Sequence, residues 1–244
     1  MPETRAEILQ GELLWSLPAD APHATKHLDL AYVLAAHVAS GYRGAIDMLT
    51  RTSLNDDFAP DASVFPADPD PQTGGRRLEE LVFEITSEQA LAVPTRKARQ
   101  LVARGVRRVF AILVKQNRVL EWDRPTDGWS PLVGRAEITD RCLVRPLSIR
   151  ALLEATEQDN EVARALLTKG NVVLAEHIAQ ERQRGHEAGQ EEGLREAICT
   201  ACKLLLIPLS EEKQSALNTM SKAALVTLLG HLRTERKWPE AVVR

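Results

Sequence analysis

The chain has 244 residues, 44% of them hydrophobic and 27% charged, which is typical of globular proteins and allows one domain with extensions or two small domains. No segment approaches the roughly 20 apolar residues of a membrane span. The first residues lack the basic-then-apolar pattern of a secretory signal, and three cysteines are too few for a disulfide framework. A net charge of −3 argues against general polyanion binding, and a cytoplasmic location is expected.

The first half of the chain alternates between strand-like and helix-like segments. Runs of β-branched and aromatic residues bounded by Pro, Gly or Asp predict short strands, and apolar residues at three- and four-residue spacing predict helices. In chain order, the expected elements are a strand at 12–17, a helix at 23–40, strands at 45–49 and 61–65, a Pro- and Gly-rich loop at 66–77, a strand at 81–86, a helix at 95–104, and strands at 106–114 and 118–122. This interleaving predicts an α/β or α+β sandwich around one mixed sheet.

From about residue 148 the chain is expected to be helical, which places a domain boundary between residues 1–147 and a helical tail at 148–244. Ser, Asp and Asn are the preferred residues at helix N-caps. Helices are therefore expected after Ser148, from Asp159 or Asn160, over a long charged segment at 172–200, over 194–207, after Ser210 and after Ser221.

The tail contains two patterns that suggest association. Gly185, Gly189 and Gly193 recur at four-residue spacing inside the long charged helix. Glycine inside a helix costs roughly 1 kcal/mol relative to alanine, so either a partner helix approaches closely there or the helix is weak and hinge-like. Four leucines near the end form an apolar stripe that must be buried, namely Leu225, Leu228, Leu229 and Leu232. We expect the tail to form a homodimer.

Three residues of the first domain have the chemistry of a metal-dependent hydrolase. Asp61 begins one predicted strand directly after Pro60, and Glu84 lies in the next, inside an otherwise apolar run. A glutamate buried in such a run is unfavourable unless it is paired or binds a metal. Carboxylates from adjacent strands can share a divalent cation, and the ammonium of Lys97 on the following helix can stabilise or orient an attacking water. The simpler interpretations are a turn aspartate, an edge-strand charge and a solvated lysine.

The order and spacing of these residues resemble the PD-(D/E)XK nuclease superfamily, in a restriction endonuclease branch whose lysine has migrated from the strand onto the following helix. Here Pro60-Asp61 precedes Glu84-Ile85-Thr86, with threonine in the usual place of the lysine. Lys97 stands eight residues before Gly105-Val106, which is the spacing of that branch. Residues 7–14 resemble its first strand and turn, and the resemblance as a whole covers residues 5–125.

The resemblance implies a restriction-endonuclease-like core with a mixed sheet. It also implies that Asp61, Glu84 and the backbone carbonyl of Ile85 bind Mg²⁺ or Mn²⁺, and that Lys97 completes the catalytic site. The implied activity is hydrolysis of phosphodiester bonds in DNA, although the sequence does not separate DNA from RNA.

Other positions qualify this interpretation. Glu7 and His27 match supporting positions of the branch, and a structural role for His27 is an equal alternative. Leu101 stands where the lysine helix of the branch usually has a tyrosine. The alternative function is therefore a catalytically degenerate nuclease-fold protein that acts as a binding or regulatory module through its helical tail.

The lysine helix and the residues after it are strongly basic. Residues 96–108 contain five arginines and Lys97 but no acidic residue. Among them, Arg96, Arg99 and Arg104 are candidates for phosphate contacts, which would make binding sensitive to salt. A solvated helix face is the alternative interpretation.

Other motifs give little support to other chemistries. Cys199 and Cys202 have CxxC spacing, but no second pair completes a tetrahedral zinc site, so both are expected in the core of the tail. The six histidines show no metal-binding spacing with a third ligand, although His23 and His27 could share a helix face. Nucleophile-elbow, Walker and dinucleotide-binding motifs do not occur.

Overall fold

The computed structural model describes residues 5–16, 20–86, 91–132 and 137–239. The chain forms two compact units, Met1–Asn171 and Val172–Arg244, and each is described by itself. Within the described residues, no helix is long and apolar enough to cross a membrane.

The first unit is built on a mixed six-stranded sheet, as the sequence predicts. Its strand order is β10-β9-β8-β7-β6-β3, and only the central β7–β8 pair is parallel. The helix between β7 and β8 makes this parallel pairing possible, because parallel neighbours need a crossover connection. The strands are β3 (Tyr42–Ile46), β6 (Ala62–Pro66), β7 (Leu81–Thr86), β8 (Arg108–Leu113), β9 (Arg118–Asp123) and β10 (Gly128–Pro131).

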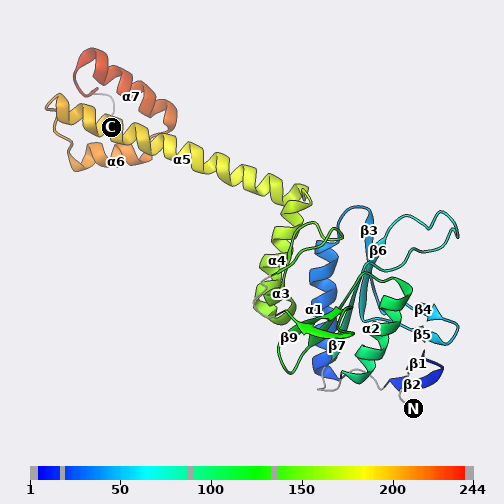
Figure 1. The fold of residues 1–244 in the computed structure, drawn as a ribbon. Coiled ribbons are helices and arrows are strands. Elements are labelled where there is room, and N and C mark those ends of the chain that lie inside the picture. Colours follow the sequence, from blue (N-terminus) through cyan, green and yellow to red (C-terminus); the bar gives the residue numbers. More distant parts are fainter. Residues whose placement is uncertain (1–4, 17–19, 87–90, 133–136, 240–244) are drawn as a thin grey trace. The chain divides into compact units, whose positions relative to one another are not determined.

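Two helices cover opposite faces of this sheet, α1 (Ala21–His37) and α2 (Ala92–Arg104) (Figure 1). Side chains along a strand alternate between the two faces. On β7, Phe83 therefore joins the core beneath α1, where it stacks on Phe110 at 5.0 Å, and Val82 joins the core beneath α2. The same alternation directs Glu84 toward α2, which decides where its carboxylate lies.

The helix ends follow from local chemistry. The Asp20 side chain caps α1 by accepting a hydrogen bond from the backbone N–H of His23 at 2.9 Å. The C-terminal end of α2, the helix that carries Lys97, lies at Gly105. Gly105 adopts a φ of 117°, and its N–H donates to the carbonyls of Leu101 and Val102. Glycine tolerates this left-handed conformation, so the expected stop at Gly105 is confirmed.

A second, smaller sheet has the strand order β2-β1-β5-β4. Its hairpin turns at Gln10 and Gly11, both with positive φ, which matches the right-handed twist of the flanking strands. Leu9 and Phe58 are fully buried and join the core beneath α2, so this sheet lies beside the helix that carries Lys97. The strands are β1 (Arg5–Leu9), β2 (Glu12–Ser16), β4 (Thr50–Ser53) and β5 (Asp56–Phe58).

The first unit extends to Asn171, past the boundary expected at residue 147. The reason is packing: α3 (Ile149–Leu153) and α4 (Ala155–Thr168) contribute Leu152 and Val162 to the same core as α1. The buried His37 of α1 also contacts Glu161 of α4 at 3.1 Å. A short two-stranded sheet, β11 (Glu137–Ile138) with β12 (Leu147–Ser148), precedes these helices.

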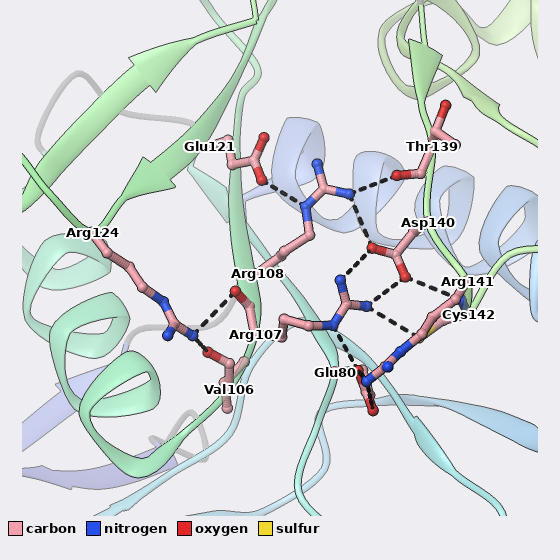
Figure 2. A network of polar contacts seen from close by, with 10 residues as sticks. All are labelled: Glu80, Val106, Arg107, Arg108, Glu121, Arg124, Thr139, Asp140, Arg141 and Cys142. Carbon is pink, nitrogen blue, oxygen red and sulfur yellow. Dashed lines mark hydrogen bonds and ion pairs between the residues drawn. The ribbon is translucent and has the colours of Figure 1, made fainter.

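Arg107, just before β8, and Arg108, its first residue, hold the segment after β11 in place (Figure 2). Both terminal nitrogens of Arg107 bond to Asp140, at 2.9 and 2.6 Å, and Arg108 bonds to Asp140 at 3.0 Å and to Glu121 at 2.6 Å. Bidentate guanidinium–carboxylate pairs are the stronger charged hydrogen bonds. These two members of the basic stretch therefore have structural partners. Arg107 also bonds to Glu80, at 2.7 Å.

The second unit consists of α5 (Val172–Leu204), α6 (Glu211–Thr219) and α7 (Lys222–Glu235). Ser210 and Ser221 cap α6 and α7, as expected. Their shared core contains buried Cys202 and the partly buried Cys199, which confirms both cysteines as core residues. The expected leucine stripe packs there too, with Leu225, Leu228 and Leu232 buried.

Several expected boundaries need correction. The strand expected at 45–49 is β3 (Tyr42–Ile46), because Asp47 turns the chain with a φ of 50°. The helix expected from Asp159 or Asn160 begins at Ala155, and Ser148 makes no capping hydrogen bond. The helices expected at 172–200 and 194–207 are one continuous helix. Leu17, where the first strand was expected to end, lies outside the described residues.

Candidate active site

Asp61 lies immediately before β6, and the antiparallel register of β6 with β7, in which Ala62 pairs with Phe83, brings it level with Glu84. Its Oδ2 accepts a short hydrogen bond from the backbone N–H of Ile85, and its Oδ1 lies 3.6 Å from Nε2 of His23. Burial by itself would raise the pKa of Asp61. The hydrogen bonds from His23 and Ile85 and the charge of Lys97 outweigh burial, so the pKa lies below its usual value.

Glu84 is buried on the α2 side of β7, with 4% of its surface exposed. Its Oε2 lies 3.5 Å from Nζ of Lys97. Its Oε1 is buried and has no hydrogen-bond partner among the described residues. Burial raises the pKa of Glu84 to about 8; the charges of Asp61 and Glu7 act in the same direction and Lys97 opposes them. An unpartnered buried oxygen of this kind calls for a cation or a proton.

Lys97 lies on the sheet-facing side of α2, and only 7% of it is exposed. Its Nζ is 3.0 Å from Oε2 of Glu7 and donates to the carbonyl of Ala59 at 3.3 Å. Burial would lower the pKa of Lys97, but the charges of Glu84, Glu7 and Asp61 raise it above its ordinary value. The side chain is therefore a buried ammonium, and the simpler interpretation of a solvated lysine is wrong.

Glu7 comes from β1 of the small sheet and connects that sheet to the site. It is 6% exposed, and its Oε1 accepts from the backbone N–H of Ala59 at 3.0 Å. Because it also contacts Nζ of Lys97, Glu7 fixes the position of the ammonium between two strands. Among the residues expected only to support the site, Glu7 makes the most direct contact with the catalytic candidates.

The histidines of α1 approach Asp61 from the other side. Nε2 of His27 donates to the backbone carbonyl of Asp61 at 2.9 Å and lies 3.9 Å from its Oδ1. The hydrogen bond to Asp61 raises the pKa of His23, partly offset by burial. The four-residue spacing of His23 and His27 does place them on one helix face, with ring centroids 6.0 Å apart.

Sequence reasoning missed one residue of this region, Asp47. It lies in the turn after β3, and its Oδ2 is 4.0 Å from Nε2 of His27. No local motif marks it. It reaches the site because β3 pairs with β6 so that Ile46 lies opposite Ala62, which brings Asp47 level with Asp61.

The three arginines expected to contact phosphates all have partners within the chain. Arg96 bonds to Glu12 at 2.7 Å and to the carbonyl of Leu9 at 3.0 Å. Arg99 bonds to Asp127 at 2.9 Å, and Arg104 donates to the carbonyl of Thr52 at 3.3 Å. These contacts lie at the surface, where ion pairs are weak, so the side chains can exchange partners.

The residues present fit a divalent metal ion. Asp61 and Glu84 would offer carboxylate oxygens, and Ile85, the next residue of β7, would offer its backbone carbonyl. Oxygen donors of these kinds are the ligands that Mg²⁺ and Mn²⁺ prefer. The buried Oε1 of Glu84 is the specific sign, because a bound cation would satisfy it.

Comparisons with known proteins concern the family and the fold of the chain. The family model Uma2, described as "Putative restriction endonuclease", matches residues 1–149. The fold is similar to a crystal structure described as a putative nuclease belonging to DUF820 from Anabaena variabilis ATCC 29413. The identity is 18% and the TM-score 0.50, over 60% of this chain and 88% of that chain. No curated protein matches the sequence.

Proposed function

The chain belongs to the Uma2 restriction endonuclease family, and from that premise we propose that it is a metal-dependent endonuclease that hydrolyses phosphodiester bonds in DNA. One observation carries the proposal. Glu84 is a buried carboxylate with an unpartnered oxygen, and it lies beside the ammonium of Lys97 at 3.5 Å. A carboxyl buried at this position is unfavourable unless a proton, a partner charge or a metal ion compensates it, and such groups gather at functional sites.

Asp61, Glu84 and the carbonyl of Ile85 are the proposed ligands for Mg²⁺ or Mn²⁺. When bound, such an ion polarises the scissile phosphate and lowers the pKa of a water molecule. The low pKa of Asp61 keeps this carboxylate charged and ready to bind a cation. The high pKa of Glu84 means that cation binding displaces a proton from its carboxyl.

Lys97 is proposed to position the attacking water and to stabilise negative charge that develops on the phosphate. Its raised pKa favours the ammonium, which donates hydrogen bonds and does not accept a proton. Glu7 and the Ala59 carbonyl hold Nζ in place, and Nζ lies 3.5 Å from the Glu84 carboxyl. A donor held in this way loses little conformational freedom in the transition state.

The non-catalytic binding or regulatory protein remains the second candidate. It is favoured by the arginine contacts, since Arg96, Arg99 and Arg104 each have a partner within the chain. Metal binding separates the two candidates, because a degenerate site would hold Mn²⁺ weakly or not at all.

Homodimerisation through the second unit is a further part of the proposal. It is supported by two leucines beyond the shared core, Leu204 and Leu206, which are 81% and 90% exposed. Light scattering tests it: the proposal requires a species of twice the chain mass of 27.0 kDa, and a monomer would contradict it.

The experiment for the main proposal is cleavage of plasmid and short branched DNA with Mg²⁺ or Mn²⁺. Wild type is compared with Asp61→Ala, Glu84→Ala and Lys97→Ala, and with the exposed control variants Asp68→Ala and Lys115→Ala. We expect metal-dependent cutting that falls at least about 100-fold in the three site variants and is unchanged in the controls. Wild type that neither cuts nor binds metal would support the non-catalytic candidate, and parallel assays on RNA identify the nucleic acid.

A further inference from the structure

A second group of potential metal ligands lies on the α1 side of Asp61. His27 comes from α1, Asp47 from the turn after β3, and Asp61 from the residue before β6. One ligand atom from each lies within 4.8 Å of the others. Nε2 of His27 is 4.0 Å from the Asp47 carboxylate and 3.9 Å from Oδ1 of Asp61. Three separate segments of the chain thus converge on one point.

These separations match the geometry of a shared ion. Two ligands that each lie about 2.1 Å from a metal are about 3 Å apart at a right angle and about 4.2 Å apart when opposite each other. The two His27 distances fall inside that interval. Both distances lie toward the upper end of that interval, so rotation of these side chains would let one cation contact all three.

This group is distinct from the position proposed for Asp61 and Glu84. The two carboxylate oxygens of Asp61 face different neighbours: Oδ2 accepts from the N–H of Ile85, next to Glu84, and Oδ1 faces the histidines. One carboxylate that bridges two ions is the arrangement of two-metal sites, whose ions lie about 3.5 to 4 Å apart. The buried, unpartnered Oε1 of Glu84 independently marks the other half of such a pair.

We propose that His27, Asp47 and Asp61 form a second divalent cation site, which takes an ion that accepts imidazole, such as Mn²⁺, in preference to Mg²⁺. This inference rests on the proposed function, because Asp61 is the ligand that the two positions share. Imidazole nitrogen suits transition metals, whereas Mg²⁺ prefers oxygen ligands only. Binding through Nε2 requires the tautomer with its hydrogen on Nδ1, and it replaces the hydrogen bond from His27 to the Asp61 carbonyl.

The site is also accessible. Side-chain exposure is 45% for Asp47 and 19% for His27, whereas it is 5% for Glu84. An ion can therefore reach His27 and Asp47 directly from solvent, and the second position is expected to exchange its ion faster than the buried one.

The test measures Mn²⁺ binding to the full chain by calorimetry and by pulsed electron paramagnetic resonance, which detects a coordinated ¹⁴N nucleus. The variants are His27→Gln, Asp47→Asn and Glu84→Gln, with His177→Gln and Asp68→Asn as exposed controls, and circular dichroism checks that each folds. We expect two Mn²⁺ ions per wild-type chain and a ¹⁴N signal that His27→Gln abolishes. We expect His27→Gln and Asp47→Asn each to bind one Mn²⁺ fewer, while the controls bind two.

Two Mn²⁺ ions in folded His27→Gln, or a wild-type complex without a ¹⁴N signal, would overturn the inference. Cleavage assays on the same proteins distinguish failure of the second metal site from failure of the proposed nuclease function. If wild type cuts DNA but shows no ¹⁴N signal, the second metal site is rejected and the nuclease function is retained. If wild type shows a ¹⁴N signal that His27→Gln abolishes, but cuts no nucleic acid, the second metal site is retained and the nuclease function is rejected.

Discussion

Nζ of Lys97 lies 3.5 Å from Oε2 of Glu84, although one residue belongs to a helix and the other to the strand before it. Both side chains are buried, and the pair links α2 to the middle of β7 beside the apolar packing of Ala98 and Leu101 on Val82. Only one oxygen of Glu84 is engaged by it, since Oε1 has no partner among the described residues. The pair thus leaves one acceptor available for a metal ion.

The first prediction concerns pH and stability in the absence of metal. The pKa of Glu84 is about 8 in the folded protein and near 4.5 for an ordinary glutamate. The stabilising effect of its bound proton is therefore complete below about 4.5 and is lost as pH rises through about 8. We expect the free energy of unfolding of wild type to fall over this window relative to Glu84→Gln, measured by urea unfolding at several pH values. The control is the exposed Glu12→Gln; equal slopes in wild type and Glu84→Gln would contradict the prediction.

The second prediction concerns metal affinity. Because a cation at Glu84 competes with the proton of its carboxyl, Mn²⁺ affinity should rise by about tenfold per pH unit below pH 8 and level off above it. Calorimetry in buffers of different ionisation enthalpy counts the released proton. Affinity that does not change with pH would show that Glu84 is not a ligand.

The third prediction concerns Glu7 as a positioning residue for Lys97. In Glu7→Gln, the amide cannot hold the ammonium as tightly as a carboxylate does at 3.0 Å. We expect kcat to fall about 10- to 100-fold with KM nearly unchanged, because a misplaced catalytic group affects the transition state more than substrate binding. Steady-state cleavage kinetics measure both constants.

Two comparisons separate positioning from folding in that experiment. Glu12→Gln removes an exposed carboxylate of the neighbouring strand, which pairs with Arg96, and should leave kcat unchanged. Glu7→Asp retains the charge and should recover part of the rate. If Glu7→Gln raised KM alone, Glu7 would act on binding and not on Lys97.

The fourth prediction concerns the core that supports the site. Phe83 is fully buried and stacks on Phe110 directly behind Glu84 on β7. Phe83→Ala should lower the free energy of unfolding by about 3 to 5 kcal/mol, through lost burial and the cavity it leaves. Leu54→Ala, at a side chain fully exposed in a turn, should change it by less than about 0.5 kcal/mol. Urea unfolding of both variants is the measurement, and similar changes in the two would refute the assignment of the core.

The fifth prediction concerns the network of Arg107 and Asp140 (Figure 2). Burial would raise the pKa of Asp140, but hydrogen bonds from Arg107, the backbone N–H of Cys142 and Arg108 hold it well below its usual value. Its stabilising contribution is present above the ordinary pKa of about 3.8 and is lost as pH falls toward the lower folded value. Asp140→Asn should lower the free energy of unfolding by about 2 kcal/mol at neutral pH and by less at acid pH. Thermal unfolding against Asp68→Asn measures it, and a loss that did not depend on pH would contradict this assignment.

Much of the first unit follows from its sequence, because local physical signals and tertiary packing agree there. The apolar alternation of 81–86 matches β7 residue for residue, and Gly105 ends the lysine helix as its conformational freedom allows. Asp61, Glu84 and Lys97 could be selected because each has the chemistry of a metal-dependent hydrolase at a recognisable spacing. The structure places Lys97 against Glu84, and Asp61 against the backbone next to Glu84.

Only the tertiary structure determines which segments distant in the sequence come into contact. Asp47 has no sequence signal, and it reaches Asp61 only through the pairing of β3 with β6. Glu7 meets Lys97 from a separate sheet, and the arginines of the basic stretch find partners up to 87 positions away, as Arg96 does with Leu9. Periodicity and spacing report which residues share one helix face or strand face. Strand register and sheet packing determine which faces meet, and that is why the residues around Asp61 became evident only in the folded chain.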